Sequence, residues 1–225
     1  MNHAAFDFDS LASTYDAWFE DKGKLIFAIE VKAFQKVLPS LPKPWLEVGV
    51  GSGRFAHSLG IEIGLDPSIK LLDMARNRGI NVFLGRGEDA PIGNESLGTA
   101  FYIVTICFVN SPLKIVKEAN RFLKEDGKVV LGLVLLESPW GRFYQAKGEE
   151  GHCFYRHATF YSYKEVERFL RQAGFEIERV LSTLFQKPGE VEHMEPPQEG
   201  FSSDAGFAVI VAGRYPTGSS GNEEG

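Results

Sequence analysis

The sequence predicts an α/β protein built on a doubly wound, mostly parallel sheet. Short apolar segments alternate with segments of helical periodicity along most of the 225 residues, the pattern typical of βαβ units. The first apolar segment, 45–48, runs directly into a loop with glycine at every second position. A later segment, 100–109, is almost entirely apolar, as expected for a central parallel strand covered on both faces. We expect a seven-stranded sheet whose last strand forms an antiparallel C-terminal hairpin with the sixth.

The individual elements follow from periodicity and from end signals. Ser111 precedes a proline at the first position of a helix, and Ser162 with Glu165 has the spacing of a capping box. The expected helices are 8–19, 24–38, 54–59, 68–77, 111–123 and 162–174. The expected strands are 45–48, 61–65, 80–84, 100–109, 128–136, 175–183 and 205–214. Residues 186–204 contain two adjacent prolines and several acids, so we expect a long exposed loop there.

Breaks in the pattern divide the chain. Three prolines between 39 and 44 separate an N-terminal helical cap, 1–43, from the core, 44–214. The segment 137–161 is the least regular part of the core and is interpreted as an insertion. Residues 215–225 are rich in Gly, Ser and Glu, and we expect a disordered tail.

Composition restricts the class of protein. A hydrophobic content of 44% over 225 residues supports one substantial core, so one domain is expected. The chain has no run of eighteen apolar residues and no basic segment followed by an apolar one at its start, so we expect neither membrane association nor export. Two cysteines are not a disulfide framework and fit a cytoplasmic protein. A net charge of −6 provides no broad basic surface for nucleic acid.

The glycine loop is the clearest indication of a ligand site. Gly49, Gly51 and Gly53 allow positive φ and a close approach of the backbone to a ligand. The nicotinamide fingerprint requires a glycine where this chain has Arg54. Glu47, two residues ahead of the loop, would repel a pyrophosphate and attract a ligand that carries ammonium and sulfonium groups. The loop therefore favours a positively charged nucleoside over a dinucleotide.

Glu-x-Gly-x-Gly-x-Gly at 47–53 resembles motif I of the class I S-adenosylmethionine-dependent methyltransferases that act on small molecules. Gly-Leu-Asp-Pro-Ser at 64–68 is similar to the second-strand motif of this family. The resemblance covers roughly 8–20 and 44–136, together with the closing helix and hairpin. It implies a Rossmann-like methyltransferase fold, with S-adenosylmethionine as cofactor and S-adenosylhomocysteine as product. It also implies in-line transfer of the methyl group to an oxygen or nitrogen of a small-molecule acceptor.

Four residues near the first two strands are expected to contact the cofactor. Asp66, at the tip of the second strand, can accept hydrogen bonds from both ribose hydroxyls, although an Asp-Pro pair is also typical of a turn or a helix cap. The resemblance places Pro67 beside it and Leu71 against the adenine. It also implies that Tyr15, in an Ala-x-x-Tyr-Asp segment, covers the cofactor. The helical spacing of Tyr15 is equally typical of a core residue.

A loop at 85–91 is expected to complete the adenine side. It resembles the family segment Gly-Asp-Ala-Glu-x-Leu-Pro, but Arg86 stands where the family has the aspartate that binds the adenine amino group. We therefore expect Gly87 and Glu88 to contact the cofactor, with Asp89 or a backbone carbonyl as alternatives. The alternative is that Glu88 and Asp89 form an acidic turn exposed to solvent, without contact to the cofactor.

The carboxyl edge of the sheet is where α/β proteins bind ligands. Thr105 and Ile106 lie near the predicted carboxyl end of the central strand and are expected to face the cofactor. The aromatic and cationic insertion 137–161 leaves the sheet at the same edge. It is interpreted as a lid and acceptor pocket, with an ordinary packed flap as the alternative.

Three side chains in the insertion are candidate general bases. His152 and His157 titrate near neutral pH, which suits removal of a proton from an acceptor, and Tyr144 is a third candidate. A loop histidine is also typical of an ordinary surface position. Together with Cys153 and His193 the histidines match no metal-ligand spacing, so we expect no metal site.

Two other functions are compatible with a nucleoside-binding sheet. One is a nicotinamide-dependent oxidoreductase, against which Glu47 and the glycine spacing argue. The other is a module that binds the cofactor without transferring its methyl group. Turnover on a panel of acceptors distinguishes the second from a methyltransferase.

Overall fold

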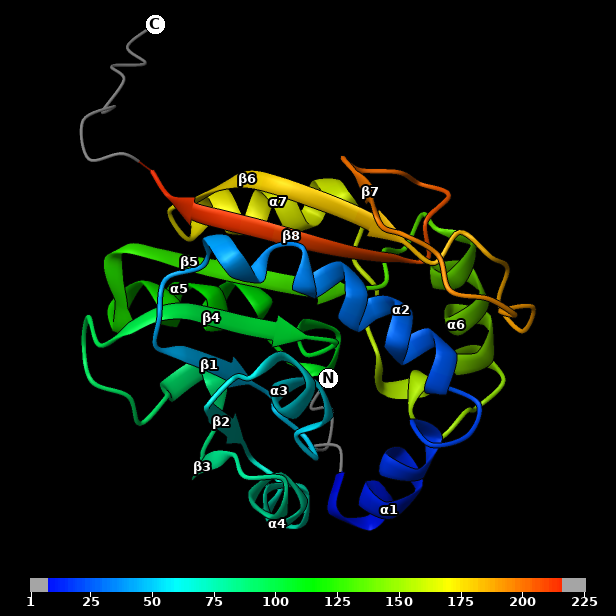
Figure 1. Ribbon diagram of the computed structural model, residues 1–225, viewed down its shortest axis with the longest axis horizontal. Coiled ribbons are helices and arrows are strands. Elements are labelled where there is room, and N and C mark those ends of the chain that lie inside the picture. The colour runs from blue at the N-terminus through cyan, green and yellow to red at the C-terminus, as the bar shows by residue number, and fades with distance from the viewer. Residues whose placement is uncertain (1–7, 216–225) are drawn as a thin grey trace, which may run out of the picture.

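The computed structural model describes residues 8–215, which Figure 1 shows arranged around one sheet. Its strands are β1 (Trp45–Val48), β2 (Ile63–Asp66), β3 (Asn81–Leu84), β4 (Leu97–Ile103), β5 (Leu123–Leu133), β6 (Phe175–Thr183), β7 (Gln198–Glu199) and β8 (Phe207–Arg214). They follow the order β3-β2-β1-β4-β5-β8-β6-β7. The first five of this order run parallel, whereas β8, β6 and β7 pair antiparallel. The predicted fold class is confirmed.

Two details of the predicted sheet are wrong. Within residues 8–215 the sheet has eight strands rather than seven, because β7 pairs with β6 inside the segment expected to be a loop. The central strand ends at Ile103, not at residue 109. Val104 adopts a φ of 51°, a conformation that a β-branched residue rarely takes. Positive φ is incompatible with extended backbone, so the strand ends there. A 3-10 turn, η3 (Ile106–Phe108), follows.

Helices cover both faces of the sheet. They are α1 (Phe8–Trp18), α2 (Lys24–Gln35), α3 (Arg54–Leu59), α4 (Ile69–Asn77), α5 (Pro112–Phe122), α6 (Pro139–Glu149) and α7 (Tyr163–Gln172), with the 3-10 turns η1 (Leu38–Ser40), η2 (Gly87–Asp89) and η4 (Tyr155–His157). Alternate residues of β4 face opposite sides: Phe101 packs in the cluster that holds Phe34 of α2, and Tyr102 in the cluster that holds Phe122 of α5. Burial on both faces explains the apolar sequence of this strand.

The helix ends behave as the sequence predicts. Ser111 caps α5 by accepting the N–H of Lys114, and the capping box of Ser162 with Glu165 begins α7. The insertion is more regular than expected, because α6 occupies 11 of its residues. Ser138 caps this helix by accepting the N–H of Gly141.

Helices α1 and α6 lie beyond the carboxyl ends of β1 and β4 (Figure 1). No helix within residues 8–215 is long and apolar enough to cross a membrane. The predicted tail lies outside the described residues apart from Tyr215.

Candidate functional site

The glycine loop joins β1 to α3 with a backbone that only glycine adopts freely. Gly49, Gly51 and Gly53 have φ values of 75°, 53° and 79°. A Cβ atom at Gly49 would lie 2.5 Å from the Thr105 side chain. The loop folds onto the neighbouring strand, where the carbonyl of Leu65 accepts the N–H of Gly49 at 2.7 Å. The loop thus presents bare backbone at the carboxyl edge of the sheet.

Asp66 links the second strand to this loop. Its Oδ2 accepts the N–H of Gly51 at 2.9 Å, and its Oδ1 accepts the N–H of Ser68 at 2.8 Å. Burial raises the pKa of Asp66, although both hydrogen bonds favour the ionised form. A carboxylate has about four acceptor positions, so two remain for hydroxyl groups of a ligand. The turn interpretation also holds, since the bond to Ser68 is local; the helix cap is Ser68 itself.

Glu47 carries an orphaned atom. The residue is buried, with an exposed fraction of 2%, and its Oε2 has no hydrogen-bond partner within the described chain. Burial raises the pKa of Glu47 well above its usual range, and the charge of Asp66 raises it further against a hydrogen bond from the Ala56 backbone. A buried acceptor without a donor is destabilising unless a ligand supplies one. The ammonium group of the cofactor can supply this donor. The bare glycine loop and the two free acceptor positions on Asp66 fit the rest of the same ligand.

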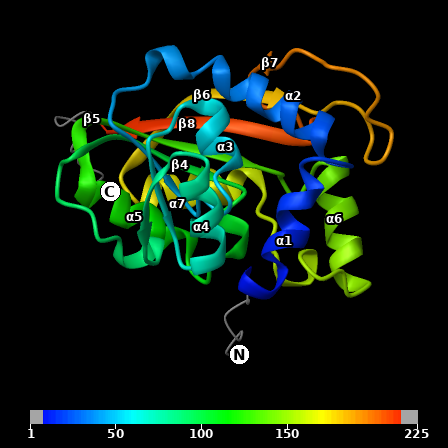
Figure 2. The same cartoon turned by 60° about the horizontal axis from the view of Figure 1, so that its bottom comes forward.

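Helix α1 lies close to α4 at the end of the molecule that holds the glycine loop (Figure 2), and an ion cluster holds it there. Arg54, directly after the last glycine, contacts Asp16 with Nη2 to Oδ2 at 2.7 Å, and Arg78 reaches the same oxygen at 2.9 Å. The neighbouring Tyr15 lies over Gly51, its Cε1 being 3.5 Å from where a Cβ of Gly51 would stand. Arg54 therefore has a role that the sequence did not reveal: it positions the helix that covers the loop.

Tyr15 lies between the glycine loop and the aromatic residue Phe154 of the insertion. Its ring meets Phe19 edge to face at 5.3 Å and Phe154 at 6.0 Å. Burial raises the pKa of Tyr15, and the charges of Glu47 and Asp66 raise it further. Both of its predicted roles are compatible with this place, since it packs on aromatic neighbours and also faces the glycine loop.

The remaining predicted cofactor residues lie around the same edge. Pro67 is exposed, and Leu71 is buried in the first turn of α4. Gly87 is buried where a Cβ would stand 2.7 Å from Val48 of β1. Glu88 pairs with Arg86, Nε to Oε2, at 3.6 Å, so the arginine that replaces the family aspartate offsets the charge of its neighbour.

The two residues after β4 differ in their surroundings. The Thr105 hydroxyl lies 3.0 Å from the carbonyls of Val48 and Ile103, and so ties β4 to β1. Ile106 has an exposed fraction of 1% and lies in the core cluster with Tyr102. Cofactor contacts of both residues remain predictions.

Two of the candidate bases, Tyr144 and His152, belong to a stack of rings formed by α6 and the segment after it. Tyr144 stacks on Tyr155 with ring centroids 4.2 Å apart, and Tyr155 stacks on His152 at 4.5 Å. Burial, and then the charge of Lys147, lowers the pKa of His152. Burial raises the pKa of Tyr144 far above its usual range. His157 is exposed, and its Nε2 lies 2.8 Å from Arg156 Nε.

Two further groups near this stack, one buried and one half-buried, were not predicted as site residues. Glu30 on α2 has an exposed fraction of 6%, and Cys107 in η3 is a free thiol whose pKa burial raises to about 12. The sequence offers no signal for Glu30, because a glutamate in an amphipathic helix is ordinarily on its solvated face. Its burial comes from tertiary packing, since residues of α1, α2 and α6 share one apolar cluster.

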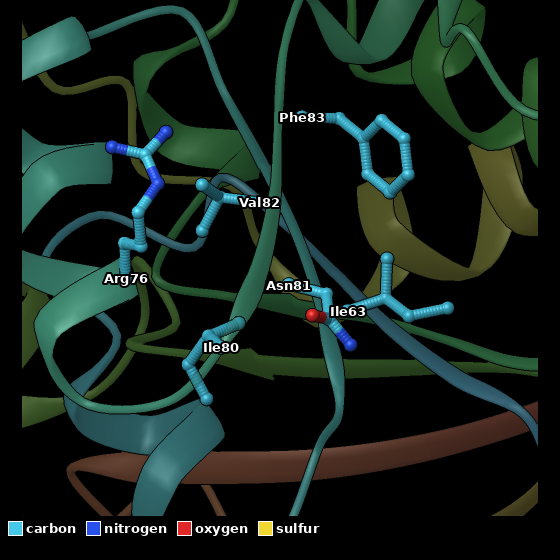
Figure 3. Close-up of a pocket in the computed structure, with 6 residues that line it drawn as sticks. All are labelled: Ile63, Arg76, Ile80, Asn81, Val82 and Phe83. Carbon is cyan, nitrogen blue, oxygen red and sulfur yellow. The ribbon is translucent and has the colours of Figure 1, made fainter.

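A hollow elsewhere on the described surface does not involve the predicted site. A shallow hollow of about 560 Å³ lies beside the edge strand β3 (Figure 3) and is lined by Ile63, Arg76, Ile80, Asn81, Val82 and Phe83. None of these is a predicted site residue. Within residues 8–215 no cluster of three or more His, Cys, Asp or Glu side chains could hold a metal ion.

Three comparisons place this geometry among known proteins. A sequence profile described as a methyltransferase domain matches residues 46–131. An uncharacterized protein of Mycobacterium tuberculosis is 37% identical over 203 residues, which cover 89% of this chain and 71% of the relative. An uncharacterized protein of Methanocaldococcus jannaschii is 35% identical over 205 residues, covering 91% and 97%. A Thermotoga maritima crystal structure, described as a SAM-dependent methyltransferase and possible histamine N-methyltransferase, matches with a TM-score of 0.86 at 37% identity. That match covers 92% of this chain and 98% of the other.

The fold and the glycine loop define a Rossmann-like, nucleoside-binding enzyme. The chain belongs to the S-adenosylmethionine-dependent methyltransferases, as its relatives and the matched profile show. S-adenosylmethionine is the cofactor, and the predicted family is confirmed. A nicotinamide-dependent oxidoreductase is not favoured.

Proposed function

We propose that this methyltransferase acts on an oxygen or nitrogen of a small-molecule acceptor. The aromatic residues near Tyr15 support the proposal: Phe154 meets the Tyr15 ring at 6.0 Å, and Tyr155, next to Phe154 in the chain, stacks on Tyr144 at 4.2 Å. Such aromatic surfaces suit a compact, partly apolar molecule. The Thermotoga maritima structure, described as a possible histamine N-methyltransferase, supports an acceptor of this size.

The chain's residues have distinct roles in this proposal. Glu47 would hold the amino group of the cofactor through its orphaned Oε2, and Asp66 would hold the ribose hydroxyls. Tyr15 would close the site over the glycine loop and exclude water. The cofactor supplies a methyl group on a positively charged sulfur. The protein's contribution to such a transfer is alignment, and a base is needed only where the acceptor must lose a proton.

The domain roles remain part of the proposal. Residues 1–43 would act as a cap and 137–161 as a lid that bounds the acceptor. His152, His157 and Tyr144 remain candidate bases; of these, His152 has the pKa that favours the neutral, proton-accepting ring at neutral pH. The proposal also places the protein in the cytoplasm, without a nucleic-acid partner.

A partition experiment tests the proposal. Purified protein is incubated with S-adenosylmethionine labelled in its methyl group and with separate small-molecule, protein and RNA fractions of a cell extract. We expect label in the small-molecule fraction, and much less of it with the Asp66→Ala variant when the cofactor is present below its saturating concentration. Label confined to protein or RNA would overturn the acceptor class. S-adenosylhomocysteine binding without label in any fraction would favour the module without transfer activity.

A further inference from the structure

Glu30 is a buried carboxyl group that the fold does not use. Within residues 8–215 no hydrogen bond or ion pair joins it to another group, and its exposed fraction is 6%. Buried carboxyl groups are ordinarily paired or hydrogen-bonded. Glu195 follows this rule, since its Oε1 accepts the N–H of Phe185 at 2.6 Å and its Oε2 accepts Gln186 Nε2 at 3.1 Å. Glu30 on α2 is thus a largely buried acid without a partner in residues 8–215, and its carboxyl group can bind a donor from outside the chain.

Three tyrosines from three elements lie within electrostatic range of Glu30. They are Tyr15 on α1, Tyr144 on α6 and Tyr155 in η4; burial raises the pKa of each, and the charge of Glu30 raises each further. The rings of Tyr144 and Tyr155 stack with their centroids 4.2 Å apart. Tyr15 and Tyr144 pack in the same apolar cluster as Ile29 and Ala33, which flank Glu30 on α2. No cation contributes to the pKa shift of Glu30.

This group of residues adjoins the cofactor side of the site. The pKa of Tyr15 is raised by burial and then by the charges of Glu47 and Asp66 as well as by that of Glu30. Tyr15 thus lies over the glycine loop, with Cε1 3.5 Å from where a Cβ of Gly51 would stand, and is also within electrostatic range of the buried acid. A group held at Glu30 would lie on the acceptor side of Tyr15.

We propose that Glu30 with Tyr15, Tyr144 and Tyr155 forms a subsite for the protonated amino group of the methyl acceptor, and that Glu30 takes up the proton that leaves this nitrogen. The inference rests on the proposed function, because it names the substrate class of the same site. A carboxylate and several aromatic faces are the groups that bind an ammonium ion in a desolvated pocket.

The proton transfer balances without any further reactant. The N–H bond of the ammonium breaks, an O–H bond forms on Glu30, and the electron pair stays on the nitrogen. The nitrogen becomes a neutral nucleophile and the carboxyl group becomes neutral. Burial raises the pKa of Glu30 to about 8, which brings it closer to that of an amine and makes this exchange accessible.

The expected pH dependence can be assigned to Glu30. Burial is the cause of its shift, and no charged group of α3, β6 or β8 contributes. Tyr15, Tyr144 and Tyr155, which face it, have pKa values raised by burial, so they stay neutral near pH 8. Nearby Cys107 also stays protonated, since burial raises its pKa to about 12. Amine affinity should therefore rise with pH as Glu30 ionises.

The test is a binding measurement with a matched pair of probes. The full-length protein saturated with S-adenosylhomocysteine is titrated by calorimetry with phenethylamine and with 2-phenylethanol. We expect the amine to bind more tightly than the alcohol, and its affinity to rise between about pH 6 and about pH 9 while that of the alcohol stays constant. Glu30→Gln should weaken amine binding roughly 10-fold or more, remove the pH dependence, and leave the affinities for the alcohol and for S-adenosylhomocysteine unchanged.

Controls separate this role from a structural one. Glu195→Gln removes a hydrogen-bonded buried acid, so it should lower the melting temperature and leave amine binding unchanged. Glu30→Gln should not lower the melting temperature, because it removes an unpaired acid. Should Glu30→Gln fail to fold, the pH dependence of the wild-type amine and alcohol affinities decides.

Equal affinities for the amine and the alcohol, or unchanged amine binding in Glu30→Gln, would overturn the inference. If label also reaches a small molecule other than an amine in the partition experiment, the proposed function stands while the inference falls. Absence of S-adenosylhomocysteine binding in the wild type would instead overturn the proposed function.

Discussion

The backbone N–H of Gly51 donates a 2.9 Å hydrogen bond to Oδ2 of Asp66. This bond joins the middle of the glycine loop to the tip of the second strand, 15 residues further on. It holds the loop and the carboxylate at the same edge of the sheet, so that the backbone and the acid can bind one ligand together.

Asp66→Ala should weaken S-adenosylhomocysteine binding by about 1–3 kcal/mol, because it removes a charged acceptor of ligand hydroxyls and releases the N–H of Gly51. Isothermal titration measures the change. Asp73→Ala is the matched control, since Asp73 is exposed and pairs only with Arg76 within the described chain. Unchanged affinity in Asp66→Ala would show that Asp66 is only a turn residue.

Glu47→Gln should weaken binding of S-adenosylhomocysteine more than that of adenosine. Adenosine lacks the amino group that we assign to the orphaned Oε2 of Glu47, and an amide is a weaker partner for an ammonium ion than a carboxylate. Parallel titrations of both ligands give the comparison. Equal losses for the two would indicate a structural effect of the substitution.

Gly49→Ala should destabilise the protein more than Gly60→Ala. Both positions have positive φ, 75° and 70°, so alanine carries a similar backbone strain of about 1–2 kcal/mol at each. Only Gly49 also meets a side chain, with Thr105 atoms 2.5 Å from the added Cβ, whereas nothing lies within 4 Å at Gly60. Overpacking should add about 1–3 kcal/mol at Gly49. Thermal unfolding of the two variants, with Gly49→Ala/Thr105→Ala as a partial rescue, checks this. Equal losses of stability in Gly49→Ala and Gly60→Ala would show that the contact with Thr105 does not contribute.

Asp16→Asn should loosen α1 and lower the free energy of unfolding by about 1–2 kcal/mol at neutral pH. Burial favours the neutral form of Asp16, but hydrogen bonds from Arg54 and Arg78 hold its pKa well below the usual range. Because the folded pKa is lowered, this stability is present above the unfolded pKa of about 3.9 and is lost as pH falls below it. The difference in melting temperature between wild type and variant should therefore persist at about pH 5 and shrink in stronger acid.

The control for Asp16 is its exposed neighbour. Glu20 also contacts Arg54, but its side chain has an exposed fraction of 66%, so Glu20→Gln should change stability little. A loss in Glu20→Gln as large as that in Asp16→Asn would contradict the assignment of the ion cluster to Asp16.

Local signals in the sequence predicted most of the elements. The glycine spacing located the loop, and Ser111, Ser162 and Glu165 located two helix starts, because caps and tight turns depend on residues close in sequence. Helix α6 was missed although Ser138 and Pro139 mark its start, since Gly141 and Gly148 weaken its helical pattern. A two-residue edge strand such as β7 has no periodicity to detect.

The acceptor side could not be predicted for a different reason. Glu30, Tyr15 and Tyr155 lie on separate elements, and their proximity depends on how α1, α2 and α6 pack at the sheet edge. The role of Arg54 was missed on the same ground, because its partner Asp16 is 38 residues away. Tertiary packing of this kind leaves no signal in a single sequence.

The cofactor site itself is tested most directly by titrating the wild-type protein with S-adenosylhomocysteine and with NADH, following intrinsic fluorescence. A carboxylate ahead of the glycine loop predicts saturable binding of S-adenosylhomocysteine and none of NADH. Saturable binding of NADH, displaced by S-adenosylhomocysteine from the same loop, would contradict it.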